Sequence, residues 1–280
     1  MIGLGLSLHK IQGISIGGGG GGPPYTPPLD DYPNAAAAYS VRLLRIAYSG
    51  SALRVRRNAA PFDEQDIGFT AGGDLDEAAI VAFGGSDVLT VSAWYDQSGQ
   101  SNHATQITPG SQFEIYDGSS IHTANGKPAA LKSGRPPHMV FTALSLSDYC
   151  IVWAGRKTQG GTDVGYMLTD ASRSEYIWDR TGIALSHRWD GSSANTNGSS
   201  GTIPYDVLYC LDKNGSSLSD LINGSSDTGT LSGTFNPSQT GLGVNSWEGY
   251  MNEIIIWDSS QSGSNQTAIN NNVNSYFGIY

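Results

Sequence analysis

The stretch from Tyr205 to Asp227 reads YDVLYCLDKNGSSLSDLINGSSD and carries the clearest β-structure pattern in the chain. Short apolar runs in it are separated by two Asn-Gly pairs, at Asn214 and Asn223. Asn-Gly is strongly preferred in two-residue hairpin turns, because both residues adopt positive φ angles with little strain. The stretch therefore predicts antiparallel strands joined by hairpin turns.

Similar runs occupy the chain on both sides of this stretch, from Leu89 onward. They are short, apolar or aromatic, and bounded by Gly, Asn, Ser and Asp: VLTVSAWYD, SDYCIVWAGR, VGYMLTD, YIWD, ALSHRWD, TGLGVNS and YMNEIIIWDSS. Repeated short strands with such turns indicate a mainly β fold, an antiparallel β-sandwich. The last residues return to helical spacing through Ile269, Val273 and Tyr276, which predicts a closing helix.

The segment 34–49, NAAAAYSVRLLRIAYS, predicts an amphipathic helix. Its apolar residues Tyr39, Leu43 and Ile46 fall on one helical face, and Asn34 is a suitable cap. The following LRVRR alternates apolar and basic residues, which is typical of a surface strand. The segment 73–85, GDLDEAAIVAFGG, predicts a second, short helix that is capped by Asp74 and closed by two glycines.

The composition argues against nucleic-acid binding and against a metal site. Charged residues make up 14% of the 280 positions, Gly supplies 37 of them, and 15 basic against 25 acidic side chains give a net charge of −10. This acidic balance, with no block of Lys or Arg, excludes a typical nucleic-acid-binding surface. Cys150 and Cys210 each lie inside an apolar run and are expected in the core. No His/Cys spacing indicates a metal site, and we expect no cofactor.

The chain divides into an arm, a hinge and a body. Residues 1–16 alternate apolar and small or polar residues, residues 17–33 form a Gly/Pro-rich hinge and linker, and residues 34–280 form the predicted sandwich domain. The arm is expected to dock on a partner protein through residues 1–22; a disordered tail is the alternative. Its apolar face consists of Leu4, Leu6, Leu8, Ile11, Ile14 and Ile16. The amino terminus is a poor secretory signal, and no apolar run is long enough to span a membrane.

Three stretches together resemble a known family: AAYSVRLLRIAYSGSALRVRRN, EQDIGFTAGGDLDEAAIVAFGG and WYDQSGQSNHATQ. They are similar to the start of the catalytic domain of the arabinofuranosidase B family, glycosidases with a concanavalin A-like jelly-roll sandwich. The same block resembles lectin-like sandwich domains of bacteriophage structural proteins. The end of the chain, from Tyr250, resembles the terminal strand and helix of laminin-G-like domains.

The third stretch also supplies candidate sugar contacts. Asp96, Gln97, Asn102 and His103 could line a sugar site, or they could form a structural corner in which short polar side chains bond the nearby backbone. His103 could also pair with Asp96 as a base. Four tryptophans could present flat faces to a sugar or fill the core instead: Trp153, Trp178, Trp189 and Trp247.

Catalysis by this family requires two carboxyl groups. The resemblance places the nucleophile near Asp170 and Glu175, although the vicinal cysteine pair of the family is missing here. The position of the family's acid corresponds best to Val244 and Asn245, neither of which can protonate a leaving group; Glu248 could substitute after a loop shift. The sequence therefore predicts a protein without enzymatic activity.

The function expected from these features is that of a bacteriophage virion structural protein, a capsid decoration, head-fibre or tail-associated component. It would be assembled in the host cytoplasm as a multimer such as a trimer, anchored to other virion proteins by its arm, and would display the sandwich for adhesion to host-surface glycans. Two alternatives stay open: a glycoside hydrolase of the arabinofuranosidase type, and a cellular lectin or adhesin.

Overall fold

The computed structural model describes residues 25–134, 138–158, 165–170, 176–180, 184–189, 192–196, 204–235, 239–245, 248–261 and 263–280. Antiparallel β structure dominates these residues, which confirms the predicted fold class. The predicted arm and residues 17–24 of the predicted hinge lie outside the described residues. The rest of that hinge, from Tyr25, packs on the body and contains a buried Leu29.

The strands, in chain order, are β1 Ala37–Ser40, β2 Leu53–Arg57, β3 Glu64–Ile67, β4 Val88–Trp94, β5 Ala104–Thr105, β6 Phe113–Asp117, β7 Thr123–Ala124, β8 Lys127–Pro128, β9 Ala130–Lys132, β10 Met139–Thr142, β11 Tyr149–Lys157, β12 Gly165–Asp170, β13 Tyr176–Arg180, β14 Ala184–Trp189, β15 Ser192–Thr196, β16 Tyr205–Asn214, β17 Ser217–Ile222, β18 Ser225–Thr230, β19 Gln239–Asn245 and β20 Gly249–Trp257. The helices are α1 Pro28–Asp31, α2 Glu77–Gly84 and α3 Gly263–Phe277, with a short 3-10 turn at Pro109–Ser111.

One strand, β4, connects the two layers of the sandwich. Along one edge it pairs with β2, and its other edge is divided between two partners. Val88 to Val91 pair with β6, whereas Ala93 and Trp94 pair with β5. The hydrogen-bonded sheet therefore divides at β4 into two branches.

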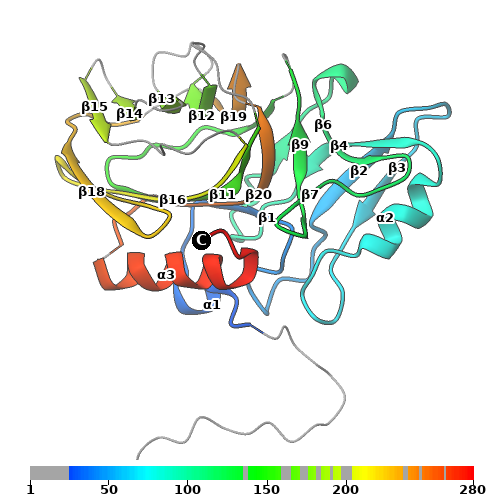
Figure 1. Cartoon of the computed structure of the whole chain (residues 1–280), viewed down its shortest axis with the longest axis horizontal. Helices are drawn as coiled ribbons and strands as arrows, with labels where there is room; N and C mark the ends of the chain where they lie inside the picture. Colours follow the sequence, from blue (N-terminus) through cyan, green and yellow to red (C-terminus); the bar gives the residue numbers. More distant parts are fainter. Residues whose placement is uncertain are drawn as a thin grey trace, which may run out of the picture.

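The two branches fold over each other (Figure 1). One continues from β5 through β10, β19, β12, β13 and β14 to β15, and the other from β6 through β9, β20, β11, β16 and β17 to β18. β1 joins the second branch by pairing with β20, and α3 covers the outer face of that branch near β16 and β11. The core consists of the side chains that both layers direct inward.

The hairpins predicted from the two Asn-Gly pairs are confirmed. β17 pairs with β18 across Asn223 and Gly224, whereas β16 pairs with β17 across Gly215 and Ser216, one residue later than the Asn-Gly pair, because Asn214 still pairs with Ser217. Asn223 and Gly224 both have positive φ angles, 48° and 77°, as a tight turn between twisted strands requires. Asn223 also accepts a hydrogen bond from the backbone nitrogen of Leu208, at 2.8 Å.

The helix predicted at residues 34–49 is wrong. Residues 37–40 form β1, which pairs with Ile256 to Glu253 of β20, and the chain after it is irregular. Asn34 has a φ of 65°, which is incompatible with a right-handed helix start. Tyr39 is fully buried, whereas Ile46, expected on the same face, is 64% exposed. Pairing with β20 overrides the helix propensity of the alanine-rich segment.

The other local predictions are closer to the structure. The strand at residues 53–57 is confirmed as β2, and the helix in residues 73–85 is confirmed as α2, although its cap is Asp76 rather than Asp74. The carboxylate of Asp76 accepts a hydrogen bond from the backbone nitrogen of Ala79, at 3.0 Å. The closing helix is confirmed as α3, which buries Ile269 and Val273.

Both cysteines are buried, unpaired core residues, as predicted. Their sulfur atoms lie 3.9 Å apart on β11 and β16, beneath α3. Trp153 is also in the core, 1% exposed, so the possibility that it presents a flat face to a ligand is wrong. Among the described helices, none has the length and apolar character to cross a lipid bilayer.

Candidate functional site

The sharpest sequence motif forms a buried polar corner around Asp96, which follows β4. Its carboxylate accepts hydrogen bonds from the backbone nitrogens of Ala38 (2.8 Å), Ser98 (2.9 Å) and Asn102 (3.0 Å), and from the hydroxyl of Ser98 (2.7 Å). Asp96 is 2% exposed. One carboxylate thus connects β1 to the turn after β4, which is the structural role of such a corner.

Two neighbouring amides complete this corner. Gln97 is fully buried; its oxygen accepts from the backbone nitrogen of Leu44, and its nitrogen donates to the carbonyls of Ser40 and Arg42. The side-chain nitrogen of Asn102 donates to the carbonyl of Ala36, at 2.7 Å. These polar groups bond the backbone, so the geometry favours the structural interpretation of Asp96, Gln97 and Asn102 over sugar contact.

Of the four candidate sugar contacts in this motif, His103 is the exposed one. Its Nδ1 accepts a hydrogen bond from the backbone nitrogen of Asp96 at 3.1 Å, and its ring meets Tyr95 edge-on. The contact joins His103 to the backbone of Asp96 and not to the carboxylate, so the proposed pairing as base and orienter is not formed. A sugar contact by His103 stays a prediction.

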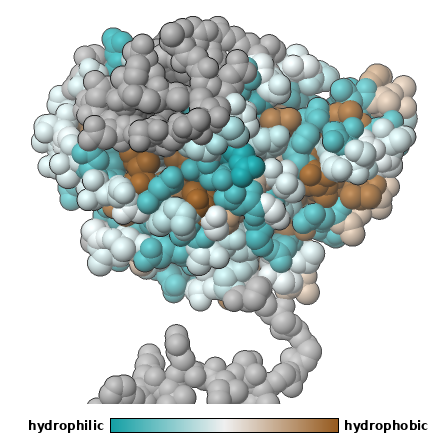
Figure 2. All heavy atoms as spheres, in the orientation of Figure 1, coloured by the Kyte–Doolittle hydropathy of each residue, from teal (hydrophilic) through white to brown (hydrophobic). Residues whose placement is uncertain are grey.

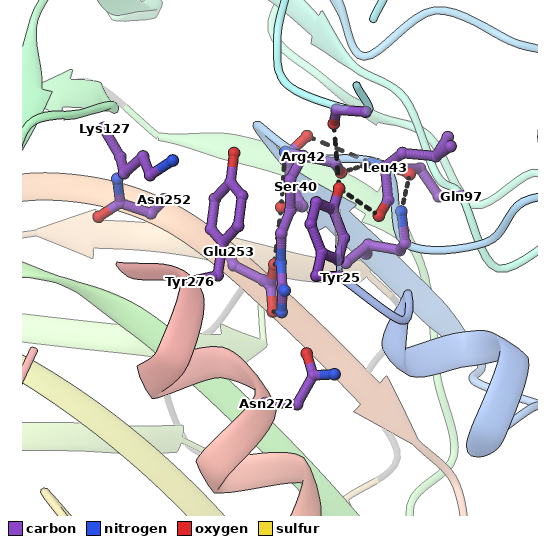
Figure 3. Close-up of polar contacts among 12 residues, drawn as sticks. Tyr25, Ser40, Arg42, Leu43, Gln97, Lys127, Asn252, Glu253, Asn272 and Tyr276 are labelled. Carbon is purple, nitrogen blue, oxygen red and sulfur yellow. Dashed lines mark hydrogen bonds and ion pairs between the residues drawn. The ribbon is translucent and has the colours of Figure 1, made fainter. Parts of the chain in front are cut away.

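A buried ion pair that sequence reasoning missed joins the segment after β1 to β20, beside α3 (Figure 3). The guanidinium of Arg42 donates two hydrogen bonds to the carboxylate of Glu253, from Nε at 2.7 Å and from Nη2 at 2.9 Å. Ser40 donates a third bond to Glu253, and both charged side chains are fully buried. Burial opposes the charge of Arg42, but the carboxylate of Glu253 outweighs it and raises the pKa of Arg42.

Aromatic rings enclose this ion pair. In Figure 3 the Arg42 side chain runs between the rings of Tyr25 and Tyr276, and its guanidinium carbon lies 5.1 Å and 4.8 Å from their centroids. Tyr25 donates to the carbonyls of Leu43 and Gly73, and Tyr276 donates to Asp74. Burial raises the pKa of both tyrosines, which stay neutral. Through Arg42, the network joins Tyr25 and α3 to Glu253 of β20. We therefore assign it a structural role.

One sequence feature could have revealed this pair. Glu253 stands alone as a charge in the run YMNEIIIW, and a lone charge in a buried strand requires a partner. The helix predicted over residues 34–49 concealed Arg42 as this partner, because the pairing of β1 with β20 brings that segment beside Glu253.

Asp74 also borders a pocket of about 340 Å³ between the start of α2 and the β7–β8 hairpin, together with Asp76, Glu77 and Lys127. Lys127 lies 3.7 Å from the carboxylate of Asp74. In the described ranges, no three His, Cys, Asp or Glu side chains are arranged to hold a metal ion. The carboxylates of Asp74 and Asp76 accept hydrogen bonds from Tyr276 and from the backbone of Ala79.

Of the candidate catalytic residues, Asp170 lies on the β12–β19 pair and Glu248 lies after β19. Asp170 ends β12, is 9% exposed and pairs with Thr240, whereas Gly165 at the other end pairs with Asn245. Five residues at ~3.3 Å each separate these two ends by about 16 Å. Glu248 lies beyond Asn245, where its carbonyl accepts from Thr158.

This separation decides one question about the chemistry. Glycosidase carboxyl pairs lie ~5 to 9.5 Å apart, so Asp170 and Glu248 do not form such a pair. Glu175 lies outside the described residues, and so does Trp247. The side chains of Trp178 and Trp189 are likewise not described, and their sugar contacts stay predictions.

The comparisons with known proteins identify the family. Residues 29–176, more than half of the chain, match the model for "Alpha-L-arabinofuranosidase B, catalytic". A probable α-L-arabinofuranosidase B of Aspergillus flavus is 32% identical over 113 residues, which are 39% of this chain and 22% of that protein. The corresponding protein of Aspergillus clavatus is 34% identical over 113 residues, with the same shares. The chain thus spans about a fifth of the length of these relatives.

Solved structures show the same fold. A GH54 α-L-arabinofuranosidase soaked with a cyclic sulfate inhibitor superposes with a TM-score of 0.63 and 18% identity, covering 88% of this chain and 64% of that one. An arabinofuranosidase complexed with arabinofuranosyl-α-1,2-xylobiose gives a TM-score of 0.60 and 16% identity over the same shares.

These findings overturn the expected function. The expectation of a bacteriophage virion protein without enzymatic activity is wrong, because the matched model describes a catalytic domain and the relatives are fungal arabinofuranosidases. The expected location in a virion is wrong for the same reason. The docking role of residues 1–22 and the trimer are not tested. The resemblance to the glycosidases, by contrast, is confirmed: this chain belongs to the family of α-L-arabinofuranosidase B catalytic domains.

Proposed function

We propose that this protein is a glycoside hydrolase that releases α-L-arabinofuranosyl groups from a carbohydrate. The observation that carries the proposal is the match of residues 29–176 to the catalytic model of that family. The fold correspondence over 88% of the chain supports it, because the remainder of the sandwich follows the same architecture.

The reaction needs one carboxyl group that attacks or stabilises the sugar cation and one that protonates the departing oxygen. The proposal assigns the first role to Asp170 or Glu175. Because Asp170 and Glu248 are too far apart to act together, Glu248 is a candidate acid only with Glu175.

Val244 and Asn245 occupy the position where the family's acid is expected, and neither side chain can donate a proton. Protonation of the leaving group is therefore the step that we expect to be slow. General acid catalysis typically contributes ~10² to 10⁴-fold in rate. A nitrophenolate departs without protonation, whereas a sugar hydroxyl does not. We therefore expect the protein to hydrolyse an activated aryl arabinofuranoside much faster than an unactivated arabinofuranosyl-xylobiose.

The test uses purified protein with 4-nitrophenyl α-L-arabinofuranoside, following nitrophenolate release. Three single variants, Asp170→Asn, Glu175→Gln and Glu248→Gln, identify the carboxyls: the loss of a required one lowers the rate at least about 100-fold. Glu64→Gln, an exposed change on β3, is the matched control and keeps the full rate. Two outcomes would contradict the proposal: the unmodified protein releases no nitrophenolate, or all three variants keep the rate of the unmodified protein.

A further inference from the structure

A second polar pocket, of about 400 Å³, lies beside the β16–β17 turn and is open to solvent. Three segments form it: the residues before β11, the hairpin turn itself and residues 232–234. The side chains that line it are Ser147, Asp148, Lys213, Ser216, Ser232 and Thr234. Its volume lies in the range of small-molecule sites.

Lys213 distinguishes this pocket from an ordinary surface hollow. It is 3% exposed, and its direct strand partners Tyr149 and Leu218 are buried in the core. Its ammonium group donates to the carbonyl of Ser147, and no carboxylate among the described residues forms an ion pair with it. An ammonium has three donors, and a buried one is costly unless they are satisfied. The lysine thus presents donors to the pocket.

Asp148 supplies the opposite charge. Its Oδ1 accepts a hydrogen bond from the backbone nitrogen of Gly215 at 2.7 Å, which fixes the carboxylate at the rim of the pocket. One ammonium and one carboxylate give the lining a net charge of zero. A neutral ligand fits this balance better than an anion, which the carboxylate would repel.

The rest of the lining consists of hydroxyl groups. Ser147 and Thr234 lie within 3.3 Å of each other through their hydroxyl oxygens. A hydroxyl both donates and accepts, so it matches the hydroxyl of a sugar, which also does both. The pocket thus combines the carboxylate of Asp148 as an acceptor, the ammonium of Lys213 as a donor, and several hydroxyls. Two adjacent hydroxyls of a sugar, which donate and accept at once, can bond to such a set.

We infer that this pocket binds a neutral sugar unit of a polysaccharide, with Lys213 and Asp148 as the principal contacts. The pocket lies at the end of the sandwich where β12 ends in Asp170: Leu146 bridges Phe235 beside it, and β19 begins four residues later, opposite Asp170. The inference does not depend on the proposed hydrolysis, because binding is measured without turnover.

The experiment titrates the full chain, labelled with nitrogen-15, with xylohexaose, a neutral oligosaccharide without arabinofuranosyl groups. We expect the amide signals of Gly215, Ser216 and Gly233 to shift. Lys213→Met should weaken binding about tenfold, the typical contribution of a hydrogen bond to a charged group. Asp148→Asn, which keeps the acceptor for Gly215, should weaken it in the same direction. Lys127→Met, at the other polar pocket, should leave the affinity unchanged.

Each result decides the inference. Shifts confined to other amides, or an affinity that both pocket variants leave unchanged, would overturn it. Inorganic phosphate or glucuronate binding more tightly than xylohexaose at the same amides would also overturn it, since the pocket would then be an anion site. The spectra themselves report whether each variant is folded.

Discussion

Two buried cations of this protein, Arg42 and Lys213, differ in the partners that surround them. Arg42 is matched by a carboxylate through two short hydrogen bonds and lies between aromatic rings. Lys213 is buried nearly as deeply, yet the described acceptor of its ammonium is one carbonyl, and it borders an open polar pocket. Burial alone therefore does not define the role of a cation: the set of partners separates an anchor of the fold from a candidate ligand contact.

The largest effect is expected at the anchor. Arg42→Met leaves the carboxylate of Glu253 buried without its cation, and we expect the free energy of unfolding to fall by about 3–5 kcal/mol. Chemical denaturation measures this. Arg54→Met is the matched control, because Arg54 pairs with Asp66 at the surface, where both side chains are about two-fifths exposed. That change should cost no more than about 1 kcal/mol. Equal losses would mean that burial adds nothing to the Arg42 pair.

An intermediate effect is expected at the Asp96 corner. Asp96→Ala removes the acceptor of three backbone nitrogens at once, and we expect a loss of about 2–3 kcal/mol in the same denaturation measurement. Asp117→Ala is the control with the same chemistry at an exposed turn, where Asp117 accepts from the backbone nitrogens of Ser119 and Ser120. Water can replace that acceptor, so the control should lose much less. A control that loses as much would contradict the role assigned to burial.

The smallest effect on stability is expected at Lys213. Lys213→Met keeps the volume of the side chain, removes one hydrogen bond and removes a charge that is costly to bury. These opposing contributions should leave the free energy of unfolding within about 1 kcal/mol of the unmodified protein. Calorimetric or denaturant unfolding checks this. A loss comparable to that of Arg42→Met would make Lys213 a second anchor and remove the contrast.

The sequence predicted best what short-range chemistry controls. The two hairpins, α2 and α3 depend on neighbouring residues, and the structure contains all of them, although the first hairpin turns one residue after Asn214. The segment 34–49 failed because its structure is set by β20, more than 200 residues away in the chain. No local pattern contains that pairing.

The site was harder to predict than the fold. The polar residues around Asp96 look the same in sequence whether they bind a sugar or the backbone, and only their partners distinguish the two. The burial of Lys213 could not be predicted, because a lysine before a turn is usually exposed. It is buried here by its pairing with β11 on one side and β17 on the other. The expected function was wrong because the missing acid and the amino-terminal arm were given more weight than the resemblance to the catalytic domain, which the match of residues 29–176 confirms.

The divided edge of β4 has a mechanical consequence. β4 pairs with β5 of one layer and with β6 of the other. The two layers therefore cannot slide past each other or separate at this point unless the backbone hydrogen bonds of β4 break. Val88–Trp94 is thus a backbone connection between the two layers, in addition to the side chains of the shared core.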